Sequence, residues 1–382
     1  MNILLLGGTG PMGIHLTRLL SNFGAIIFVT SRTFHEDYGN VHFIKGNAKD
    51  PQFIDLVLKS REWDCIVDFM VYGTSEFRAR IDMLMSSTKQ YIFLSSARVY
   101  SASDNRLTEQ SLRILDVTED KKYLNTDEYA LYKAREEDIV INSRYTNYTI
   151  IRPYITYAEN RLPLGIWEKE TWVRRLSEQK SLALPACFLS KQTTLAYGMD
   201  VSLYISKIVC NEKALGQIYN IVANKSMTWY EVLNCYLDEI ECFKGYRPQI
   251  VVVDYFTTNF KQILKNFSLW LFCFRFIRNK INVQDCSYQL IYDREYDRIF
   301  DNRKLVELIP EFEFSDTRKK LKSCLRSFMQ APNYSYRNWN WEFVQDKITG
   351  NKSTLHDIPG IMLKLRYLLI RYIIPIKCMA KF

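Results

Sequence analysis

Cysteine is scarce in this sequence, with nine residues in 382, and no two cysteines stand in a CxxC spacing. The scarcity excludes a disulfide framework, and the missing spacing argues against a zinc ribbon or a dithiol redox motif. Cys65 and Cys273 stand within apolar runs, as buried thiols commonly do. We therefore predict no metal site and a reducing compartment, the cytoplasm.

Long apolar runs are also missing, since no stretch reaches the ~18 uncharged apolar residues of a membrane-spanning helix. The opening residues, MNILLLGGTG, lack a basic region and are interrupted by glycines, so they are not predicted to be a signal peptide. With 14 Gly, 10 Pro and 24% charged residues, the composition is that of an ordinary globular protein. It excludes disorder, collagen and a low-complexity scaffold.

The net positive charge of the chain comes from its C-terminal part. The formal net charge is +9 overall. Residues 241–382 hold 24 Lys and Arg against 14 Asp and Glu, a net +10, whereas residues 1–240 hold 27 against 28, a net −1.

Short apolar runs alternate with amphipathic stretches up to about residue 160. The runs predict strands at 3–6, 25–30, 41–44, 65–67, 91–94 and 148–151, and the stretches predict helices at 11–23, 51–60, 75–86 and 127–142. This alternation is typical of βαβ units in a parallel sheet. Later segments are mainly helical, at 166–178, 200–212 and 228–240, with one apolar run at 218–222.

We therefore predict an α/β fold with a Rossmann-type doubly wound parallel sheet and a smaller, mostly helical C-terminal substrate lobe. The predicted domains are a dinucleotide-binding domain at 1–160, a substrate lobe at 161–330 that is interwoven with it, and a basic aromatic extension at 331–382.

A glycine-rich turn, Gly7-Gly8-Thr9-Gly10-Pro11-Met12-Gly13, joins the first predicted strand to the first helix. Its glycines permit a tight turn, close approach of the backbone to a pyrophosphate, and close packing of helix on strand. The helix N-terminus directs N–H groups and a partial positive charge at phosphates. A turn of this spacing can also bind nothing, but its position after the first strand favours a dinucleotide. We assign Gly7, Gly10, Met12 and Gly13 to that site.

The second predicted strand ends at Thr30-Ser31-Arg32, where an NAD-binding protein usually carries an acidic residue. Ser31 and Arg32 could instead receive a 2′-phosphate, because arginine pairs with phosphate in a fork geometry. The alternative is a solvated Arg32. We favour NADP over NAD.

Four further motifs follow in order: GNAKD at 46–50, LSSARVY at 94–100, YALYK at 129–133 and RPYITY at 152–157. Together with the turn they resemble the extended short-chain dehydrogenases/reductases, in the NAD-dependent epimerase/dehydratase family. The resemblance covers roughly residues 1–240 and does not extend to 241–382. It implies a nucleotide-sugar substrate, a homodimer, and a cofactor contact from Asn47, where an aspartate is frequent in that family.

Tyr129 and Lys133 stand four positions apart in a helix that we expect to begin near position 126, since Asn125 with Glu128 resembles a capping box. They would lie one turn apart on one face. A phenol is normally neutral at pH 7, but a nearby ammonium and a positive nicotinamide favour the phenolate. Tyr129 could then act as a base, with Lys133 also holding the cofactor ribose. Ser96, at the end of a predicted strand, could donate to the reacting oxygen.

The resemblance implies these same catalytic roles for Tyr129, Lys133 and Ser96. This sequence departs from one group in that family, the sugar-nucleotide 4,6-dehydratases, which carry an acidic pair after the polarising residue. Ala97 and Arg98 stand there instead, so dehydration is disfavoured. Arg98 could face solvent or reach a phosphate.

No acidic residue stands between Asp254 and Asp285, a span that is rich in aromatic and basic residues. It could be a core helix with basic ends, a membrane-surface helix, or a site for nucleic acid or a diphosphate. In a helix its apolar stripe would be Phe267, Trp270, Leu271 and Phe274, and a peripheral membrane contact would hold the protein at the inner face of the membrane. The stretch 361–377 is similar, but Arg366 projects nearly opposite Lys364 and Arg371, which argues against a clean amphipathic helix.

The sequence thus predicts a cytoplasmic enzyme that moves a hydride between NADP or NAD and a carbinol carbon of a nucleotide-activated sugar, as an epimerase. One alternative is an NADPH-dependent keto-sugar reductase without epimerisation. Another is a catalytically idle, NADP-binding regulator or RNA-associated protein on the same fold. In the leading interpretation the partner is a nucleotide sugar, and no nucleic acid is expected.

Overall fold

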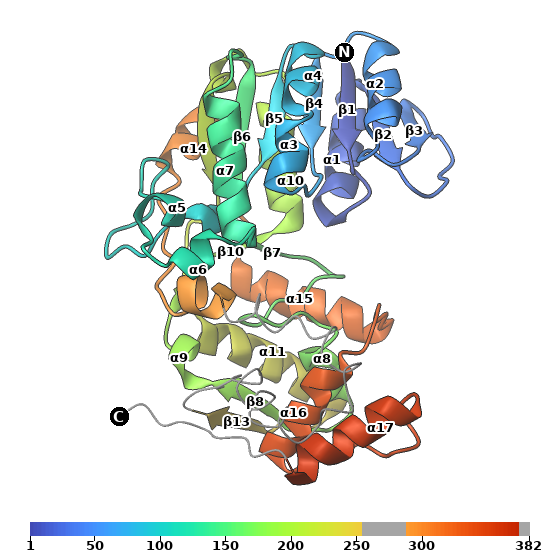
Figure 1. The fold of residues 1–382 in the computed structure, drawn as a ribbon, viewed down its shortest axis with the longest axis vertical. Coiled ribbons are helices and arrows are strands. Elements are labelled where there is room, and N and C mark those ends of the chain that lie inside the picture. The colour runs from blue at the N-terminus through green and yellow to red at the C-terminus, as the bar shows by residue number, and fades with distance from the viewer. Residues whose placement is uncertain (254–287, 374–382) are drawn as a thin grey trace. The chain divides into compact units, whose positions relative to one another are not determined.

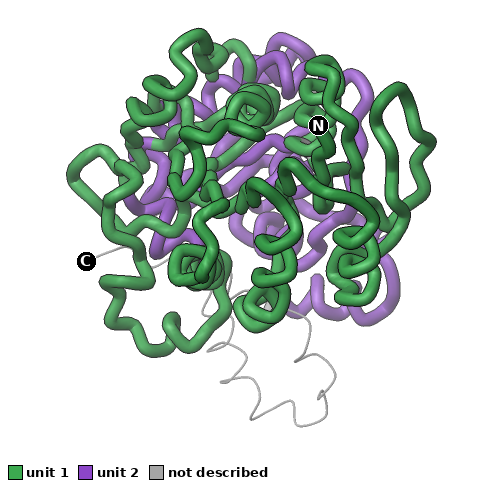
Figure 2. The backbone as a smooth tube through the Cα atoms, turned by 90° about the horizontal axis from the view of Figure 1, so that it is seen from above, with its two compact units in different colours: residues 1–160, 193–226, 297–320 green, residues 161–192, 227–296, 321–382 purple. Residues whose placement is uncertain are grey.

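The computed structural model describes residues 1–253 and 288–373, which belong to two compact units (Figure 2). Unit 1 comprises residues 1–160, 193–226 and 297–320. Unit 2 comprises, of the described residues, 161–192, 227–253, 288–296 and 321–373. The chain therefore returns to unit 1 twice after residue 160. The sequence assigned 193–226 and 297–320 to the second lobe, whereas the structure has them in unit 1.

Unit 1 is built on a seven-stranded sheet (Figure 1). Its strands are β1 (Asn2–Leu6), β2 (Ile26–Ser31), β3 (Val41–Lys45), β4 (Cys65–Asp68), β5 (Tyr91–Leu94), β6 (Tyr148–Pro153) and β11 (Gln217–Ile221). They lie in the order β11-β6-β5-β4-β1-β2-β3, and each neighbouring pair is parallel. This confirms the predicted doubly wound parallel sheet. The strand order reverses at β1, where folds of this class bind ligands beyond the carboxyl ends of the strands.

Helices cover both faces of the sheet. They are α1 (Pro11–Asn22), α2 (Pro51–Lys59), α3 (Thr74–Arg78), α4 (Ile81–Ser86), α7 (Tyr129–Ile141), α10 (Gly198–Ile208) and α14 (Arg303–Leu308). The short helices α5 (Ile114–Val117) and α6 (Lys121–Leu124) precede α7 in the chain. Ile3 and Leu5 of β1 belong to a buried cluster with residues of α1 and α10. Leu4 and Leu6 belong to a second cluster with α2, α4 and α7. The uninterrupted apolar run of β1 is thus explained by burial on both faces.

One predicted helix, 75–86, is two helices in the structure, α3 and α4, with a break at Ala79 and Arg80. Arg80 is buried, and its guanidinium donates to the carbonyl oxygens of Ala48 and Lys49, at 3.2 Å each. Arg80 therefore bonds to the loop at Ala48 and Lys49 at the point where the predicted single helix is interrupted. Short strands β7 (Ile155–Tyr157) and β10 (Leu195–Tyr197) form a separate parallel pair within unit 1.

The described part of unit 2 is mainly helical, as predicted. Its helices are α8 (Trp172–Ser177), α9 (Ala186–Leu189), α11 (Trp229–Lys244), α16 (Trp339–Thr349), α17 (Ile361–Leu368), the π-helical turns η4 (Leu290–Arg294) and η5 (Leu369–Ile373), and most of α15 (Thr317–Gln330). Strands β8 (Leu182–Pro185) and β13 (Ile250–Val253) pair in parallel. The short strands β9 (Gln192–Thr193) and β12 (Met227–Thr228) stand where the chain crosses between units. Within the predicted helix 166–178, the structure has only the shorter helix α8.

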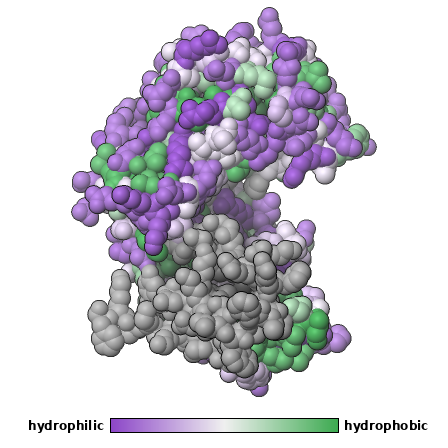
Figure 3. All heavy atoms as spheres, in the orientation of Figure 1, coloured by the Kyte–Doolittle hydropathy of each residue, from purple (hydrophilic) through white to green (hydrophobic). Residues whose placement is uncertain are grey.

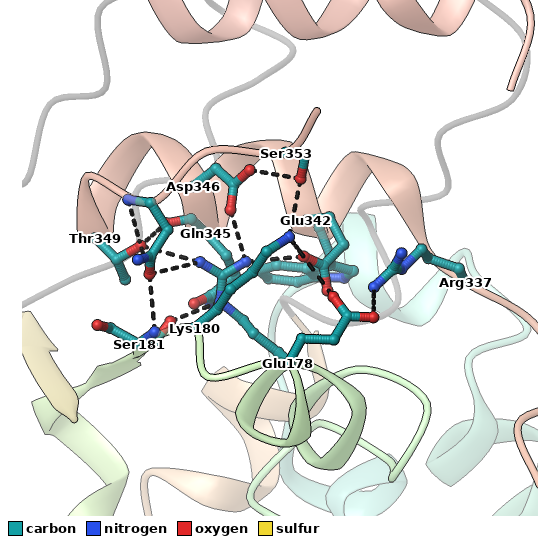
Figure 4. Close-up of polar contacts among 12 residues, drawn as sticks. Glu178, Lys180, Ser181, Arg337, Glu342, Gln345, Asp346, Thr349 and Ser353 are labelled. Carbon is teal, nitrogen blue, oxygen red and sulfur yellow. Dashed lines mark hydrogen bonds and ion pairs between the residues drawn. The ribbon is translucent and has the colours of Figure 1, made fainter. Parts of the chain in front are cut away.

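A buried ion cluster ties α16 to α8 within unit 2. Arg175 is fully buried, and its Nη1 donates to Glu342 at 2.8 Å and to Asp346 at 2.9 Å. The Ser353 hydroxyl donates to the other oxygen of Asp346 at 2.7 Å (Figure 4). Removing one partner of such a buried pair typically costs ~3–5 kcal/mol. The described part of 331–382 is thus anchored to α8.

The predicted basic aromatic segment at 261–280, with its stripe of Phe267, Trp270, Leu271 and Phe274, lies outside the described residues, as does Cys273. Its three interpretations therefore stay predictions. Among the described residues, no helix is long and apolar enough to cross a lipid bilayer.

Candidate active site

The glycine turn joins β1 to α1 as predicted. Gly7 has φ +70°, and a Cβ there would stand 2.8 Å from the sulfur of Met70. A Cβ on Gly13 would stand 2.3 Å from the carbonyl oxygen of Gly8, so helix and turn are in backbone contact. Gly10 is the N-cap of α1, and as a glycine it has no side chain to cap that helix end. The N–H groups of the first turn of α1 are therefore left for a ligand.

The ends of β2 and β3 carry the other predicted cofactor residues. Thr30 accepts a hydrogen bond from the Gly7 amide at 3.0 Å, which fixes β2 against the glycine turn. Ser31 is buried and accepts from the Thr33 amide at 3.2 Å, whereas Arg32 is exposed. Asn47 is exposed, and its side-chain oxygen accepts from the amide of Lys49 at 3.1 Å. All of these positions lie at or just after the carboxyl ends of parallel strands, so they share one edge of the sheet with the turn.

Ser96 follows β5 at the same edge. It is buried and caps the 3₁₀ turn η1 (Ala97–Val99), where its hydroxyl oxygen accepts from the Arg98 amide at 3.2 Å. The Arg98 side chain turns toward the start of α7. Its guanidinium donates to Glu128 at 2.7 Å and lies 5.1 Å from the ring centroid of Tyr129. Arg98 therefore links the Ser96 turn to Tyr129. Its side chain is 12% exposed, so it does not project into solvent, and a contact with a phosphate stays a prediction.

Helix α7 begins at Tyr129, three residues later than predicted. Asn125 does not cap it, because that residue ends the short helix α6, where its amide donates to the Lys121 carbonyl at 3.1 Å. Glu128 is the N-cap instead, and its carboxylate accepts from the Ala130 amide at 2.8 Å. The predicted one-turn spacing of Tyr129 and Lys133 still holds, since Tyr129 is the first residue of the helix and Lys133 lies one turn later. Tyr129 itself is half-buried.

Lys133 is almost fully buried, at 2% exposed, and its ammonium lies 3.0 Å from Oε2 of Glu136. The same ammonium lies 4.6 Å from the ring centroid of Phe93 in β5. No hydrogen bond of good geometry to Lys133 Nζ is formed within the described residues. Burial raises the pKa of Glu136 to about 7, although Lys133 opposes that rise.

Asp68, at the end of β4, is a further buried carboxyl group beside this site. It accepts from the Tyr91 hydroxyl at 2.8 Å and from the Met70 amide at 2.9 Å. Burial raises its pKa, while these hydrogen bonds and the charge of Lys133 act in the opposite direction. Asp68 thereby fixes the segment that packs against Gly7.

A second carboxylate on α7, Glu137, holds that helix in position. It is fully buried, accepts from the Ser95 hydroxyl at 2.5 Å, and forms two hydrogen bonds of 2.7 Å with the guanidinium of Arg152 in β6. Arg152 also donates to the Tyr100 hydroxyl at 2.7 Å. Paired, charge-assisted hydrogen bonds of this kind are geometrically specific. They fix the rotation of α7, and with it the directions of Tyr129 and Lys133.

Sequence reasoning missed Glu136, Glu137 and Asp68, and it gave Glu128 another role, as the partner of Asn125 in a capping box. Glu136 stands seven positions after Tyr129 and three after Lys133, so helical spacing alone puts it on the same face. That spacing is the sequence signal that places Glu136 near Lys133, but it does not distinguish a buried carboxylate from a solvated one.

Comparison with known proteins gives matches in structure only, since no family model and no curated protein matches the sequence. The structure is similar to that of the enzyme WbmH of Bordetella bronchiseptica in complex with NAD+, at 12% identity and a TM-score of 0.62, covering 87% of this chain and 99% of that chain. It is similar to dTDP-glucose 4,6-dehydratase of Bacillus anthracis in complex with NAD, at 17% identity and a TM-score of 0.59, covering 87% and 97%. It is also similar to UDP-glucuronic acid 4-epimerase of Bacillus cereus in complex with UDP-glucuronic acid and NAD, at 13% identity and a TM-score of 0.60, covering 86% and 99%.

These similarities extend over nearly the whole length of each solved chain. At such low identities they establish the fold. They confirm, at the level of the fold, the resemblance that the motifs of residues 1–240 predicted.

Proposed function

We propose that this chain is an enzyme that binds NAD or NADP at the Gly7–Gly13 turn and acts on a carbinol carbon of a nucleotide-activated sugar. The observation that carries the proposal is the presence of Ser96, Tyr129 and buried Lys133 at the same sheet edge as that turn. The turn fits a dinucleotide, because Gly7 and Gly13 leave no room for a Cβ and the first turn of α1 is uncapped by side chains of the described residues. A bound nicotinamide supplies a hydride acceptor and donor.

The protein's own part in the reaction is proton handling and orientation. Tyr129 takes the proton of the substrate hydroxyl and later returns it, as a general base and acid. Lys133 supplies a positive charge that favours the phenolate and holds the cofactor ribose. The Ser96 hydroxyl oxygen accepts from the Arg98 amide, and in this proposal its proton is donated to the reacting oxygen of the substrate.

An epimerase or a reductase fits these residues better than a dehydratase. Dehydration needs an acid and a base beside the polarising residue, and Ala97 and Arg98 stand there instead. Arg98 is engaged by Glu128 at 2.7 Å. Of the similar solved proteins, one is named a 4,6-dehydratase and another a 4-epimerase of nucleotide sugars. The nucleotide-sugar substrate class, the preference for NADP, the homodimer and the cytoplasmic location remain part of the proposal.

The test is to identify what the purified chain binds and converts. Mass spectrometry of the denatured protein would reveal co-purifying NAD, NADP or nucleotide sugar. The protein would then be incubated with a panel of UDP- and dTDP-sugars, with products resolved by chromatography and NMR. An epimerase converts substrate without net consumption of cofactor, whereas a reductase consumes NADPH stoichiometrically. Failure to bind either dinucleotide in a calorimetric titration would overturn the proposal.

A further inference from the structure

The ion pair of Lys133 and Glu136 lies in the interior of unit 1, whereas hydrophilic side chains cover much of the visible surface of that unit (Figure 3). Among the described residues, neither carboxylate oxygen of Glu136 accepts a hydrogen bond of good geometry, and no cation besides Lys133 pairs with it. Buried polar atoms are usually hydrogen-bonded, and a buried charge is costly without a partner. The negative charge of Glu136 therefore depends on one ammonium group.

The adjacent carboxylate, Glu137, is equally buried but is held in its ionised form. It accepts from the Ser95 hydroxyl at 2.5 Å and twice from the guanidinium of Arg152, at 2.7 Å each. An arginine keeps its charge at every physiological pH, so this partner is permanent. Within the described chain, Glu136 has no comparable set of donors. Of these two neighbours, Glu136 is the one that can take up a proton without breaking a hydrogen-bond network.

The other ionisable groups around Glu136 disfavour its negative charge. Burial raises the pKa of Glu136 to about 7, the charges of Asp68 at the end of β4 and of Asp127 before α7 add to the rise, and Lys133 opposes it. The phenols of Tyr91 in β5 and Tyr132 in α7 are also near, since burial first and then the charge of Glu136 raise the pKa of each. The charged groups on the described helices and turns that pack on α7 are engaged elsewhere or exposed: Glu76 pairs with Arg80, Arg98 with Glu128 and Asp116 with Arg113, and Arg78 is exposed.

We propose that dinucleotide binding draws the Lys133 ammonium away from Glu136, and that Glu136 then takes up a proton from solvent. This inference rests on the proposed function, in which the same ammonium holds the cofactor ribose. Lys133 keeps its own proton throughout, so the one change of charge is that the Glu136 carboxylate becomes a carboxylic acid. An ionised carboxylate left in the interior without its cation is costly, whereas the protonated acid is neutral. Glu136 is thus a positioning residue that holds Lys133 until a dinucleotide is bound.

The sign of the resulting pH dependence follows from the direction of proton transfer. Because binding takes up a proton, dinucleotide affinity falls as the pH rises. Well below pH 7 the free protein already carries protonated Glu136, so binding takes up no further proton there. Above pH 7 the free protein carries the carboxylate, and affinity should fall by up to about tenfold per pH unit until the bound form also ionises.

The experiment is calorimetric titration of the full-length protein with NADH and with NADPH over a range of pH, in two buffers whose ionisation enthalpies differ. The difference in heat between the buffers counts the protons taken up. Reduced dinucleotides are used because they lack the positive nicotinamide that favours loss of the Tyr129 proton. The wild-type protein should take up about 0.5–1 proton per bound dinucleotide slightly above pH 7, and its affinity should fall at higher pH.

Glu136→Gln should bind dinucleotide without this proton and with a flatter pH profile, whereas Glu136→Asp, which keeps a carboxyl group, should restore part of the uptake. Glu119→Gln is the matched control, because it removes the same charge from an exposed position and should behave as the wild-type protein. Comparing the wild-type protein with Glu136→Gln also cancels any proton taken up by the 2′-phosphate of NADPH.

The outcomes separate this inference from the proposed function. Dinucleotide binding without proton uptake, or with equal uptake by the wild-type protein and Glu136→Gln, overturns the inference and leaves the proposed function standing. A protein that binds neither dinucleotide at any pH overturns both. If urea unfolding shows that Glu136→Gln does not fold, the wild-type titration with NADH decides, since NADH has no 2′-phosphate, and an absence of proton uptake slightly above pH 7 refutes the inference.

Discussion

The ammonium of Lys133 and the carboxylate of Glu136 lie 3.0 Å apart in the interior of unit 1, and both side chains are shielded from solvent. Burial raises the pKa of Glu136 to about 7, so the carboxyl group changes charge near neutrality. When it is ionised, it attracts the ammonium that the proposed mechanism uses for Tyr129 and for the cofactor ribose. The pair thus couples the proposed site to pH.

The first prediction concerns stability and pH at Glu136. Its pKa in the folded protein, about 7, lies above the ordinary 4.5, so the folded state holds the proton more tightly than the unfolded state. The stabilising contribution is complete below about pH 4.5 and is lost as the pH rises through 7. Between those values the wild-type protein should lose on the order of 1–3 kcal/mol of unfolding free energy relative to Glu136→Gln, which cannot titrate.

Urea unfolding at a series of pH values measures this difference. Glu119→Gln serves as the control, because Glu119 is exposed and its variant should follow the wild-type pH dependence. Parallel pH curves for the wild-type protein and Glu136→Gln would contradict the prediction.

The second prediction separates two neighbouring tyrosines on α7. Tyr129→Phe removes the proposed base and should lower turnover by ~10²-fold or more, with little change in cofactor affinity. Tyr132 is 8% exposed, and burial raises its pKa further from neutrality, so Tyr132→Phe should leave turnover within a small factor. The two variants would be compared by steady-state kinetics on the substrate found in the panel. The reverse ranking would show that the catalytic tyrosine has been wrongly assigned.

The third prediction concerns the choice of dinucleotide. Ser31 ends β2 and Arg32 follows it, and Arg32 is exposed, so its guanidinium is accessible to a 2′-phosphate. NADP should bind more tightly than NAD, and Arg32→Ala should narrow the difference without changing NAD affinity. Calorimetric titration of both dinucleotides into both proteins measures it. Tighter binding of NAD by the wild-type protein would refute the preference, and would favour an epimerase, which recycles its cofactor.

Local patterns were enough to predict the order of elements in unit 1. The apolar run Ile3–Leu6 predicts a strand correctly because both faces of that strand are buried. The glycine turn is predictable because Gly7 and Gly13 have no room for a side chain. The predicted helix 75–86 is wrong at a point where a tertiary contact stands. Arg80 breaks the predicted helix 75–86 by bonding to carbonyls about thirty residues earlier, at Ala48 and Lys49.

The polar interior of the site was less predictable. Glu136 and Glu137 are adjacent in sequence and equally acidic, but one faces Lys133 and the other pairs with Arg152 from β6. That difference depends on how α7 sits on the sheet, which no local pattern encodes. The predicted start of α7 is wrong for a local reason: Asn125 ends the preceding helix α6, and Glu128 caps α7 instead.

The last prediction tests the glycine turn with two substitutions that differ in their steric consequence. A Cβ at Gly13 would stand 2.3 Å from the Gly8 carbonyl oxygen, so Gly13→Ala must push α1 away from the turn. We expect it to lower the unfolding free energy by about 1–3 kcal/mol. At Gly10 the nearest atom would be 4.0 Å away, and its φ of −76° is accessible to alanine. Gly10→Ala should therefore cost less than Gly13→Ala, on the order of 0.5–1 kcal/mol, because alanine is a poorer N-cap than glycine.

Dinucleotide binding then distinguishes the two roles of the turn. If the backbone at Gly10 approaches a pyrophosphate, the added methyl group of Gly10→Ala obstructs that approach, and affinity should fall although the fold is intact. Gly13→Ala should lose both stability and affinity. Urea unfolding and calorimetric titration of the two variants provide the measurements. The added methyl group of Gly10→Ala would stand at the N-cap of α1, where the helix N-terminus would meet the phosphates. If this variant binds dinucleotide as tightly as the wild-type protein, the phosphates do not lie against this turn.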